Sequence, residues 1–233
     1  SINVTTSTQT LNVTLTPPSD LFVSSVSYPQ EMDANGSYTI TYTVSNSGSS
    51  ATHTPNWNDA IYISQLPQMT SSATRLALLQ HNAVLDADSS YTTAATVTIP
   101  GNIAEGWYLF VVTDVNNNVY EYIYEDNNIY RSDTTVTIRV PDLAVQSITL
   151  SSDHVSPGQT FTLTYQVANV GSGTLSNTSW RDAVYMSNSP QFHSNNATLL
   201  TSSRYMLTLH PDSTYSNTYN ITLPTNISGN RYI

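Results

Sequence analysis

The sequence predicts an all-β protein, and composition, residue alternation and turn signals all support this fold class. Serine and threonine make up 66 of the 233 residues, whereas residues that favour helices are scarce. Apolar and hydroxyl side chains alternate along several segments, as they do when one face of a strand is buried. Pairs of glycine, proline and asparagine that form turns lie between these segments. No stretch shows a helical period.

Strands are predicted in chain order from this alternation. In residues 38–44, the apolar side chains fall on one face of a strand and the threonines on the other, and residues 161–167 repeat this pattern. Shorter alternating runs are Leu11, Val13 and Leu15; Ala95, Val97 and Ile99; and Val136, Ile138 and Val140. Turns are predicted at Asn35-Gly36, Asn46-Ser47-Gly48, Pro100-Gly101-Asn102 and Pro157-Gly158.

The chain contains an internal repeat. The motif Trp57-x-Asp59-Ala60-Ile61-Tyr62-x-Ser64 recurs 123 residues later as Trp180-x-Asp182-Ala183-Val184-Tyr185-x-Ser187. Asp20-Leu21 recurs as Asp142-Leu143, and Asp88-Ser89-x-Tyr91 recurs as Asp212-Ser213-x-Tyr215. Two repeats of about 122 residues, each with about seven short strands, are what a tandem pair of immunoglobulin-like β-sandwiches requires.

The repeat divides the chain into three predicted segments. Residues 1–19 are expected to form an extended strand that completes another domain. Residues 20–140 form the first sandwich, and residues 141–233 form a second sandwich that lacks its last strands. Pro141 marks the boundary between the sandwiches, because proline ends a strand and restricts the residue before it.

These motifs resemble the CARDB family, the "cell adhesion related domain found in bacteria". The resemblance spans residues 20–233. It rests on the repeated tryptophan motif, on Gly106-Trp107-Tyr108-Leu109-Phe110-Val111-Val112-x-Asp114 and on Val119-x-Glu121-x-x-x-Glu125-x-Asn127-Asn128. It implies immunoglobulin-like sandwiches that occur in tandem in secreted and surface proteins, and therefore an adhesive or stalk module.

The two ends of the sequence suggest how copies could connect. Ile233 corresponds to Leu109, so the second repeat stops before the counterparts of residues 110–140. Counted back by 122 residues, residues 1–16 correspond to residues 123–138, the final strand of a repeat.

Three interpretations of these ends stay open. The residues are a window on a longer tandem chain, or the run Leu11, Val13 and Leu15 of one subunit fills the open edge of a neighbouring copy, or the ends are arbitrary. The first two interpretations both produce a linear fibre or stalk.

Composition and charge exclude several partners. Sixteen acidic residues against six arginines and no lysine give a net charge of −10, which disfavours binding to nucleic acid. No apolar run reaches the roughly 18 residues of a membrane helix. Cysteine is absent, which excludes disulfides and thiolate metal sites.

No motif predicts catalysis or a cofactor, so we expect a protein that is not an enzyme. The five histidines are scattered, and the sequence has no nucleophile elbow, P-loop or dinucleotide fingerprint. Trp57 and Trp180 could stack on sugars, but their equivalent positions in the two repeats favour packing inside the fold.

An acidic run could bind Ca²⁺ through oxygen ligands, but no metal site is predicted. Its members are Asp114, Glu121, Glu125 and Asp126. Their spacing is not that of an EF-hand loop, and a solvated acidic hairpin explains them better.

Attached glycans are predicted from context. Asn-x-Ser/Thr sequons occur at Asn3, Asn12, Asn35, Asn177, Asn196, Asn220 and Asn226. Composition alone accounts for most of them, but a lysine-free, weakly charged surface would gain solubility from sugars. An intact mass equal to the 25.5 kDa polypeptide would contradict this prediction.

The sequence therefore predicts a structural repeat of an extracellular or cell-surface fibre, stalk or adhesin. Its partners would be copies of itself or neighbouring repeats of the same chain. The alternative is a ligand- or carbohydrate-binding accessory module of a larger secreted protein.

Overall fold

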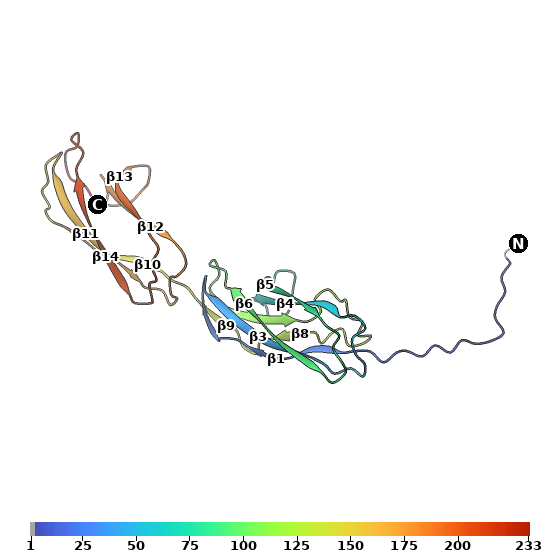
Figure 1. Ribbon diagram of the computed structural model, residues 1–233. Coiled ribbons are helices and arrows are strands. Elements are labelled where there is room, and N and C mark those ends of the chain that lie inside the picture. The colour runs from blue at the N-terminus through green and yellow to red at the C-terminus, as the bar shows by residue number, and fades with distance from the viewer. Residues whose placement is uncertain (1–2) are drawn as a thin grey trace.

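The computed structural model describes residues 3–233, which form fourteen strands and no helix. The predicted all-β fold class is confirmed. Figure 1 shows two groups of strands in series and an N-terminal segment that extends away from the first group. We call β1–β9 the first unit and β10–β14 the second unit. Among the described residues, no helix is long and apolar enough to cross a membrane.

The first unit is a sandwich of two sheets. One sheet has the order β1-β3-β6, with β1 at Leu21–Ser27, β3 at Ser37–Asn46 and β6 at Ser90–Thr98. The other has the order β2-β9-β7-β4-β5, and β8 also pairs with β7. Its strands are β2 (Glu31–Asp33), β4 (Asn56–Ser64), β5 (Thr74–Asn82), β7 (Glu105–Val112), β8 (Ile129–Arg131) and β9 (Val136–Arg139).

The core of the first unit lies between these sheets and follows the predicted alternation. Ile40, Tyr42 and Val44 of β3 are buried, while threonines of the same strand pair across the outer face, as Thr43 Oγ1 does with Thr92 Oγ1 at 2.9 Å. Residues of both sheets join one apolar cluster. Burying each such side chain contributes about 1.5–3 kcal/mol.

The second unit repeats the strand pairing of the first but has fewer strands. One sheet has the order β10-β11-β14, with β10 at Leu143–Leu150, β11 at Thr160–Asn169 and β14 at Thr214–Thr222. The other pairs β12 (Trp180–Ser187) with β13 (Ala197–Tyr205). The register shift after Val23 in β1 recurs after Val145 in β10. The predicted boundaries at residues 19/20 and 140/141 stay predictions.

A buried asparagine fixes the start of each unit. Asn46 Nδ2 donates to the carbonyl oxygen of Leu85 at 3.0 Å, and its Oδ1 accepts from the N–H of Asp20 at 3.0 Å. Asn169 makes the same two contacts with Leu209 and Asp142, at 3.0 and 2.9 Å. Both asparagines are buried, so these bonds satisfy polar groups that water does not reach.

Candidate functional site

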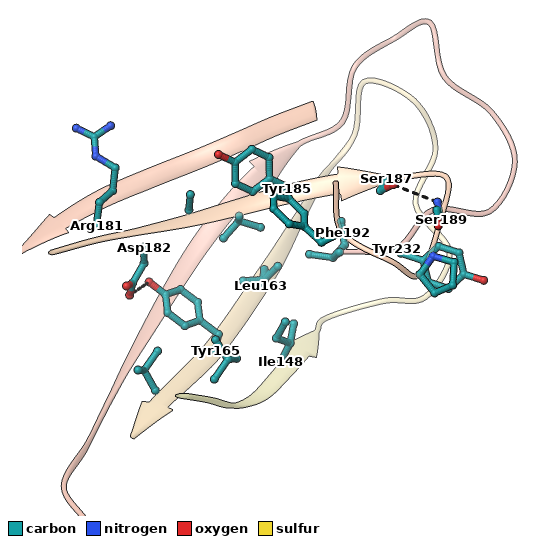
Figure 2. Close-up of a pocket in the computed structure, with 16 residues that line it drawn as sticks. Ile148, Leu163, Tyr165, Arg181, Asp182, Tyr185, Ser187, Ser189, Phe192 and Tyr232 are labelled. Carbon is teal, nitrogen blue, oxygen red and sulfur yellow. Dashed lines mark hydrogen bonds between the residues drawn. The ribbon is translucent and has the colours of Figure 1, made fainter. Parts of the chain in front are cut away.

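The second unit has an apolar cavity of about 530 Å³ between its two sheets. Figure 2 shows Ile148, Leu163 and Tyr165 on one side of it and Tyr185 and Phe192 on the other. The apolar and aromatic residues that line it are Val145, Ile148, Leu163, Tyr165, Val167, Ala183, Val184, Tyr185, Pro190, Phe192, Tyr232 and Ile233. The cavity is therefore an open part of the core rather than a polar cleft.

The equivalent residues of the first unit are covered. Val23 is 8% exposed, whereas its counterpart Val145 is 62% exposed. Val26 packs against the core of the first unit, whereas its counterpart Ile148 is 48% exposed. Strands β7 and β9 complete the opposite sheet of the first unit, and no described strand takes their places in the second. Exposed apolar patches of this kind mark interaction sites.

Strand β12 also presents an open backbone edge. Its counterpart β4 pairs with β5 on one side and with β7 on the other, from Ala60 to Ser64. In the described residues, β12 pairs with β13 and makes one further bridge, between Ser187 and Tyr232. In that bridge the N–H of Ser187 donates to the carbonyl oxygen of Tyr232 at 2.9 Å, and the N–H of Tyr232 donates to the carbonyl oxygen of Ser187 at 2.8 Å. An open strand edge beside an exposed core is a template for another strand.

An aspartate marks the end of the cavity. Asp182 accepts hydrogen bonds from the hydroxyls of Tyr165 at 2.8 Å and Tyr215 at 2.6 Å, both at Oδ2. Burial raises the pKa of Tyr165 and of Tyr215 above the usual range, and the nearby carboxylate adds to this effect. Both tyrosines therefore stay protonated and donate their hydroxyl hydrogens to the Asp182 carboxylate.

The equivalent Asp59 has more donors. It accepts from the hydroxyls of Tyr42 at 3.1 Å and Tyr91 at 2.5 Å, and also from Thr113 Oγ1 at 2.8 Å and the N–H of Asp114 at 3.3 Å. The last two donors directly follow β7. In the first unit, β7 therefore positions two of the donors to Asp59. The cavity of the second unit lies at the place that corresponds to β7, next to Asp182.

Half of the acidic run forms a buried structural turn, where the sequence predicted a solvated hairpin; Asp126 is exposed and Glu125 is half-buried. Asp114 Oδ2 accepts the N–H of Val119 at 2.7 Å, and Glu121 accepts from Asn128 Nδ2 at 2.6 Å and from the N–H of Leu21. Glu121 and Asp114 are buried, because the loop folds back onto the start of β1. This contact spans 100 residues, so local sequence gave no sign of it. Within residues 3–233, no group of three or more metal-ligating side chains is present.

Glu121 makes the stability of the first unit depend on pH. Its pKa is raised from the usual 4.5 to about 7, mainly by burial and to a lesser extent by the neighbouring Glu125 and Asp114, while the hydrogen bonds from Asn128 and Leu21 partly oppose this rise. Between these pH values the folded unit keeps a proton that the unfolded chain releases. The free energy of unfolding should therefore fall by about 3 kcal/mol as pH rises from 4.5 to 7, and stay level above 7 as far as this group is concerned.

Denaturant unfolding at pH 5 and pH 8 measures this dependence, and Glu121→Gln is the control. Asn128 Oδ1 is buried without a partner, so rotation of the Asn128 amide lets it accept from either the protonated carboxyl group or the glutamine amide. The glutamine variant should lose most of the pH dependence. Equal pH dependence in both proteins would show that Glu121 is not its source.

The predicted assembly strand makes no strand in the single chain. Leu11 is 87% exposed, Val13 is 79% exposed and Leu15 is 53% exposed, and residues 3–19 contain no strand. The predicted contact between this run and an open edge thus stays a prediction. The seven sequon asparagines are all exposed, so each is accessible for the predicted modification.

The tryptophans of the repeat motif pack inside the fold. Trp57 is buried, stacks on His81 with ring centroids 4.1 Å apart, and donates from Nε1 to the hydroxyl of Tyr91. Trp180 is half-buried and donates in the same way to Tyr215 at 2.9 Å. Each tryptophan thus makes ring contacts and a hydrogen bond within its own unit, Trp57 with His81 and Tyr91 and Trp180 with Tyr205 and Tyr215.

Comparison with known proteins adds a family match. The CARDB family model matches residues 18–132. No curated protein sequence matches the chain.

Three solved structures are similar to parts of the chain. A CARDB domain from Pyrococcus furiosus in complex with di-metal ions is 18% identical, with a TM-score of 0.40, and the alignment covers 54% of this chain and 97% of that domain. A β-glucosidase from Listeria innocua in complex with glucose is 15% identical, with a TM-score of 0.32 and coverage of 52% and 16%. Red sea bream transglutaminase is 8% identical, with a TM-score of 0.32 and coverage of 88% and 27%. The alignments thus span only a small part of the two enzymes.

Proposed function

We propose, on the premise that residues 18–132 form a domain of the CARDB family, that this chain is a structural repeat of an extracellular fibre, stalk or adhesin. The family relates the chain to cell adhesion. The finer proposal is that copies associate head to tail, because the N-terminal segment of one copy closes the second unit of the next by donor-strand complementation. The role is mechanical rather than catalytic, and glycans on the exposed sequons keep the weakly charged surface soluble.

The observation that carries the proposal is that the chain exposes two matching apolar features. The second unit presents an apolar cavity and an unpaired strand edge, and the N-terminal segment presents alternating apolar side chains without a partner. Each side chain that becomes buried contributes about 1.5–3 kcal/mol. This gain and the new main-chain hydrogen bonds offset the entropy cost of ordering the strand, which is about 1–2 kcal/mol per residue.

The geometry of the chain favours a linear assembly. Figure 1 shows the N-terminal segment at one end of the molecule and the second unit at the other. A contact between two different ends of identical copies is heterologous, and it propagates as a filament when it does not close into a ring. A fibre or stalk needs only this one contact.

Negative-stain microscopy of the purified chain tests the proposal, with sedimentation velocity to measure the size distribution. The 233-residue protein should form linear assemblies, and deletion of residues 1–16 should leave monomers with an intact first unit, because the described part of this segment, residues 3–16, belongs to neither of its sheets. Unchanged assemblies after the deletion, or a 233-residue chain that stays monomeric at high concentration, would refute it.

An exposed aromatic loop supports the second candidate function, a carbohydrate-binding accessory module. Tyr120, Tyr122 and Tyr124 lie in one loop of the first unit and are 41–54% exposed. Aromatic rings with a polar hydroxyl suit contacts that are part apolar and part wet. Glycan-array binding by monomers that is lost in Tyr122→Ala would favour this function over assembly.

A further inference from the structure

The second unit has another groove, next to the cavity described above, which we call the slot. Its volume is about 500 Å³. Residues 153, 155–157 form one wall and residues 227–231 form the other. Leu150, Phe161, Met186, Leu223 and Ile233 form the apolar floor.

Strand β9 fills the equivalent place in the first unit. It lies between β2, to which it is parallel, and the first residues of β7, to which it is antiparallel. Ile138 pairs with Met32 on one side and with Glu105 on the other. By the repeat, the counterparts of Met32 and Glu105 are Val155 and Gly229, which lie on opposite walls of the slot.

One left-handed backbone position in or next to each wall of the slot is the same as in the first unit. Glu105 has a φ of 71°, and Gly229 has a φ of 82°. At the other wall, Asn35 has a φ of 62° and its counterpart Gly158 a φ of 78°. A strand that enters the slot therefore meets preformed partners, which reduces the cost of binding.

The N-terminal segment carries the sequence of β8 and β9. Asn3-Val4-x-x-Ser7-x-x-Thr10-Leu11-x-Val13-x-Leu15 matches Asn128-Ile129-x-x-Ser132-x-x-Thr135-Val136-x-Ile138-x-Val140 at an offset of 125 residues. Leu11 and Val13 thus correspond to the buried Val136 and Ile138. An offset of 122 would instead place Thr14 and Thr16 at these buried positions. A shift by an odd number of residues turns a strand's apolar face outward.

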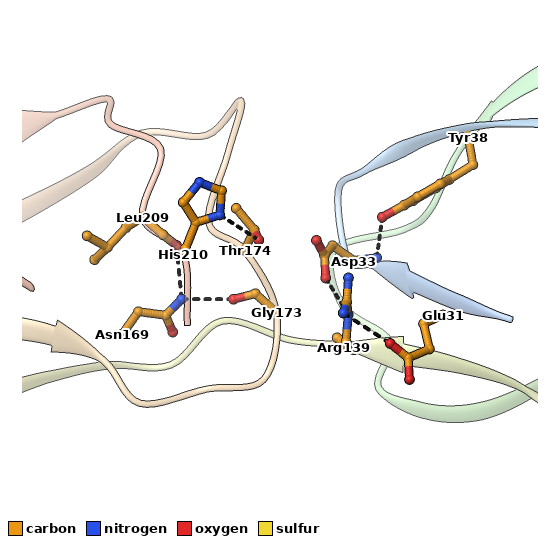
Figure 3. Close-up of polar contacts among 9 residues, drawn as sticks. All are labelled: Glu31, Asp33, Tyr38, Arg139, Asn169, Gly173, Thr174, Leu209 and His210. Carbon is orange, nitrogen blue, oxygen red and sulfur yellow. Dashed lines mark hydrogen bonds and ion pairs between the residues drawn. The ribbon is translucent and has the colours of Figure 1, made fainter. Parts of the chain in front are cut away.

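The ion pairs that Arg139 of β9 makes in the first unit have no counterpart between the N-terminal segment and the slot. In the first unit, Arg139 of β9 forms ion pairs with Asp33 at 2.8 Å and Glu31 at 3.1 Å, as Figure 3 shows. The counterparts of the two acidic residues are Ser156 and His154, and the counterpart of Arg139 in the N-terminal segment is Thr14. The acidic pair and its arginine are therefore both replaced in the proposed strand and slot. Two charged residues do line the slot, Asp153, which contacts His154 at 2.8 Å, and Arg231.

We infer that residues 11–14 of a second copy occupy this slot as a strand parallel to residues 154–156 and antiparallel to residues 229–231. The inference rests on the proposed function and gives its register. Leu11 and Val13 point to the floor. Asn12 and Thr14 point outward, which leaves the sequon at Asn12 accessible. One hydrogen bond of the first unit is lost, because Pro157 replaces Ala34, whose N–H donates to the carbonyl oxygen of Arg139 at 2.8 Å.

Cysteine crosslinking tests the register, and the natural chain has no cysteine to interfere. In this register Asn12 lies opposite Asn230, as Thr137 lies opposite Gly106. Residues opposite each other in an antiparallel pair have Cα atoms about 4.5–5.5 Å apart, which suits a disulfide. The double variant Asn12→Cys/Asn230→Cys should give a ladder of covalent multimers on a non-reducing gel after mild oxidation, and the ladder should disappear on reduction.

Two matched double variants test other registers of the strand. In Thr14→Cys/Asn230→Cys, the cysteine at position 14 also faces outward but is shifted by two residues along the strand. In Val13→Cys/Asn230→Cys, the cysteine at position 13 points to the opposite face of the strand. We expect each to give about tenfold less multimer than the Asn12 pair. Negative stain under reducing conditions shows whether each variant still assembles.

The outcomes separate the register from the proposed function. Assembly with stronger crosslinking through Thr14 or Val13, or with none through Asn12, would overturn the register and leave donor-strand complementation in place. A disulfide formed within one chain would overturn the choice of a second copy as donor. Absence of self-association in the unsubstituted chain would overturn the proposed function itself.

Discussion

Replacing Leu11 and Val13 together with aspartate should abolish self-association of the full chain. In the proposed assembly both side chains enter an apolar slot, and a buried carboxylate without a partner is strongly unfavourable. Loss of the two apolar contacts alone removes about 3–6 kcal/mol, so the dissociation constant should rise at least about 100-fold. Sedimentation velocity across a concentration series measures this change.

The matched control is Asn12→Asp/Thr14→Asp, which adds the same charge to the same segment. These side chains point outward in the inferred strand, so the control should assemble nearly as well as the unsubstituted chain. If both double variants lose assembly equally, charge repulsion between the acidic copies, rather than burial of Leu11 and Val13, explains the loss.

Replacing Asp59 with alanine should cause the largest loss of stability in the first unit. Asp59 is 1% exposed, and its carboxylate accepts the bonds from Tyr42, Tyr91 and Thr113 described above. Its removal leaves these hydroxyl donors buried without an acceptor, which should cost about 3–5 kcal/mol. Differential scanning calorimetry should show the corresponding thermal transition lowered by about 10 °C or more.

Asp182→Ala is the matched control in the second unit. Asp182 is only half-buried and accepts from two tyrosines, so its removal should cost clearly less. An equal effect of the two substitutions would contradict the account in which the donors after β7 complete the environment of Asp59.

The long strands could be predicted from sequence because their alternation is local. Residues 38–44 and 161–167 alternate in the sequence, and β3 and β11 bury the predicted side chains. Strand β2 has three residues, too few for alternation to appear. Its parallel pairing with β9 joins segments more than 100 residues apart, and nothing in the local sequence encodes such a pairing.

The candidate site was predictable only in part. The repeat predicted a second sandwich without its last strands, and the alternation of Leu11, Val13 and Leu15 predicted a strand. The phase that we infer for that strand rests on the burial of Val136 and Ile138 in the structure, because a count along the sequence does not show which face is buried. The burial of Glu121 could not be predicted either, because its partner Leu21 lies 100 residues away in the sequence.

Peptide complementation tests the central claim most directly. A chain without residues 1–16 is mixed with a synthetic peptide of residues 1–16, and binding and thermal stability are measured by calorimetry. The account predicts saturable binding of one peptide per chain and an upward shift in the unfolding of the second unit, and neither with a peptide that carries Leu11→Asp and Val13→Asp. An unchanged transition at saturating peptide concentration would show that this segment does not complete the second unit.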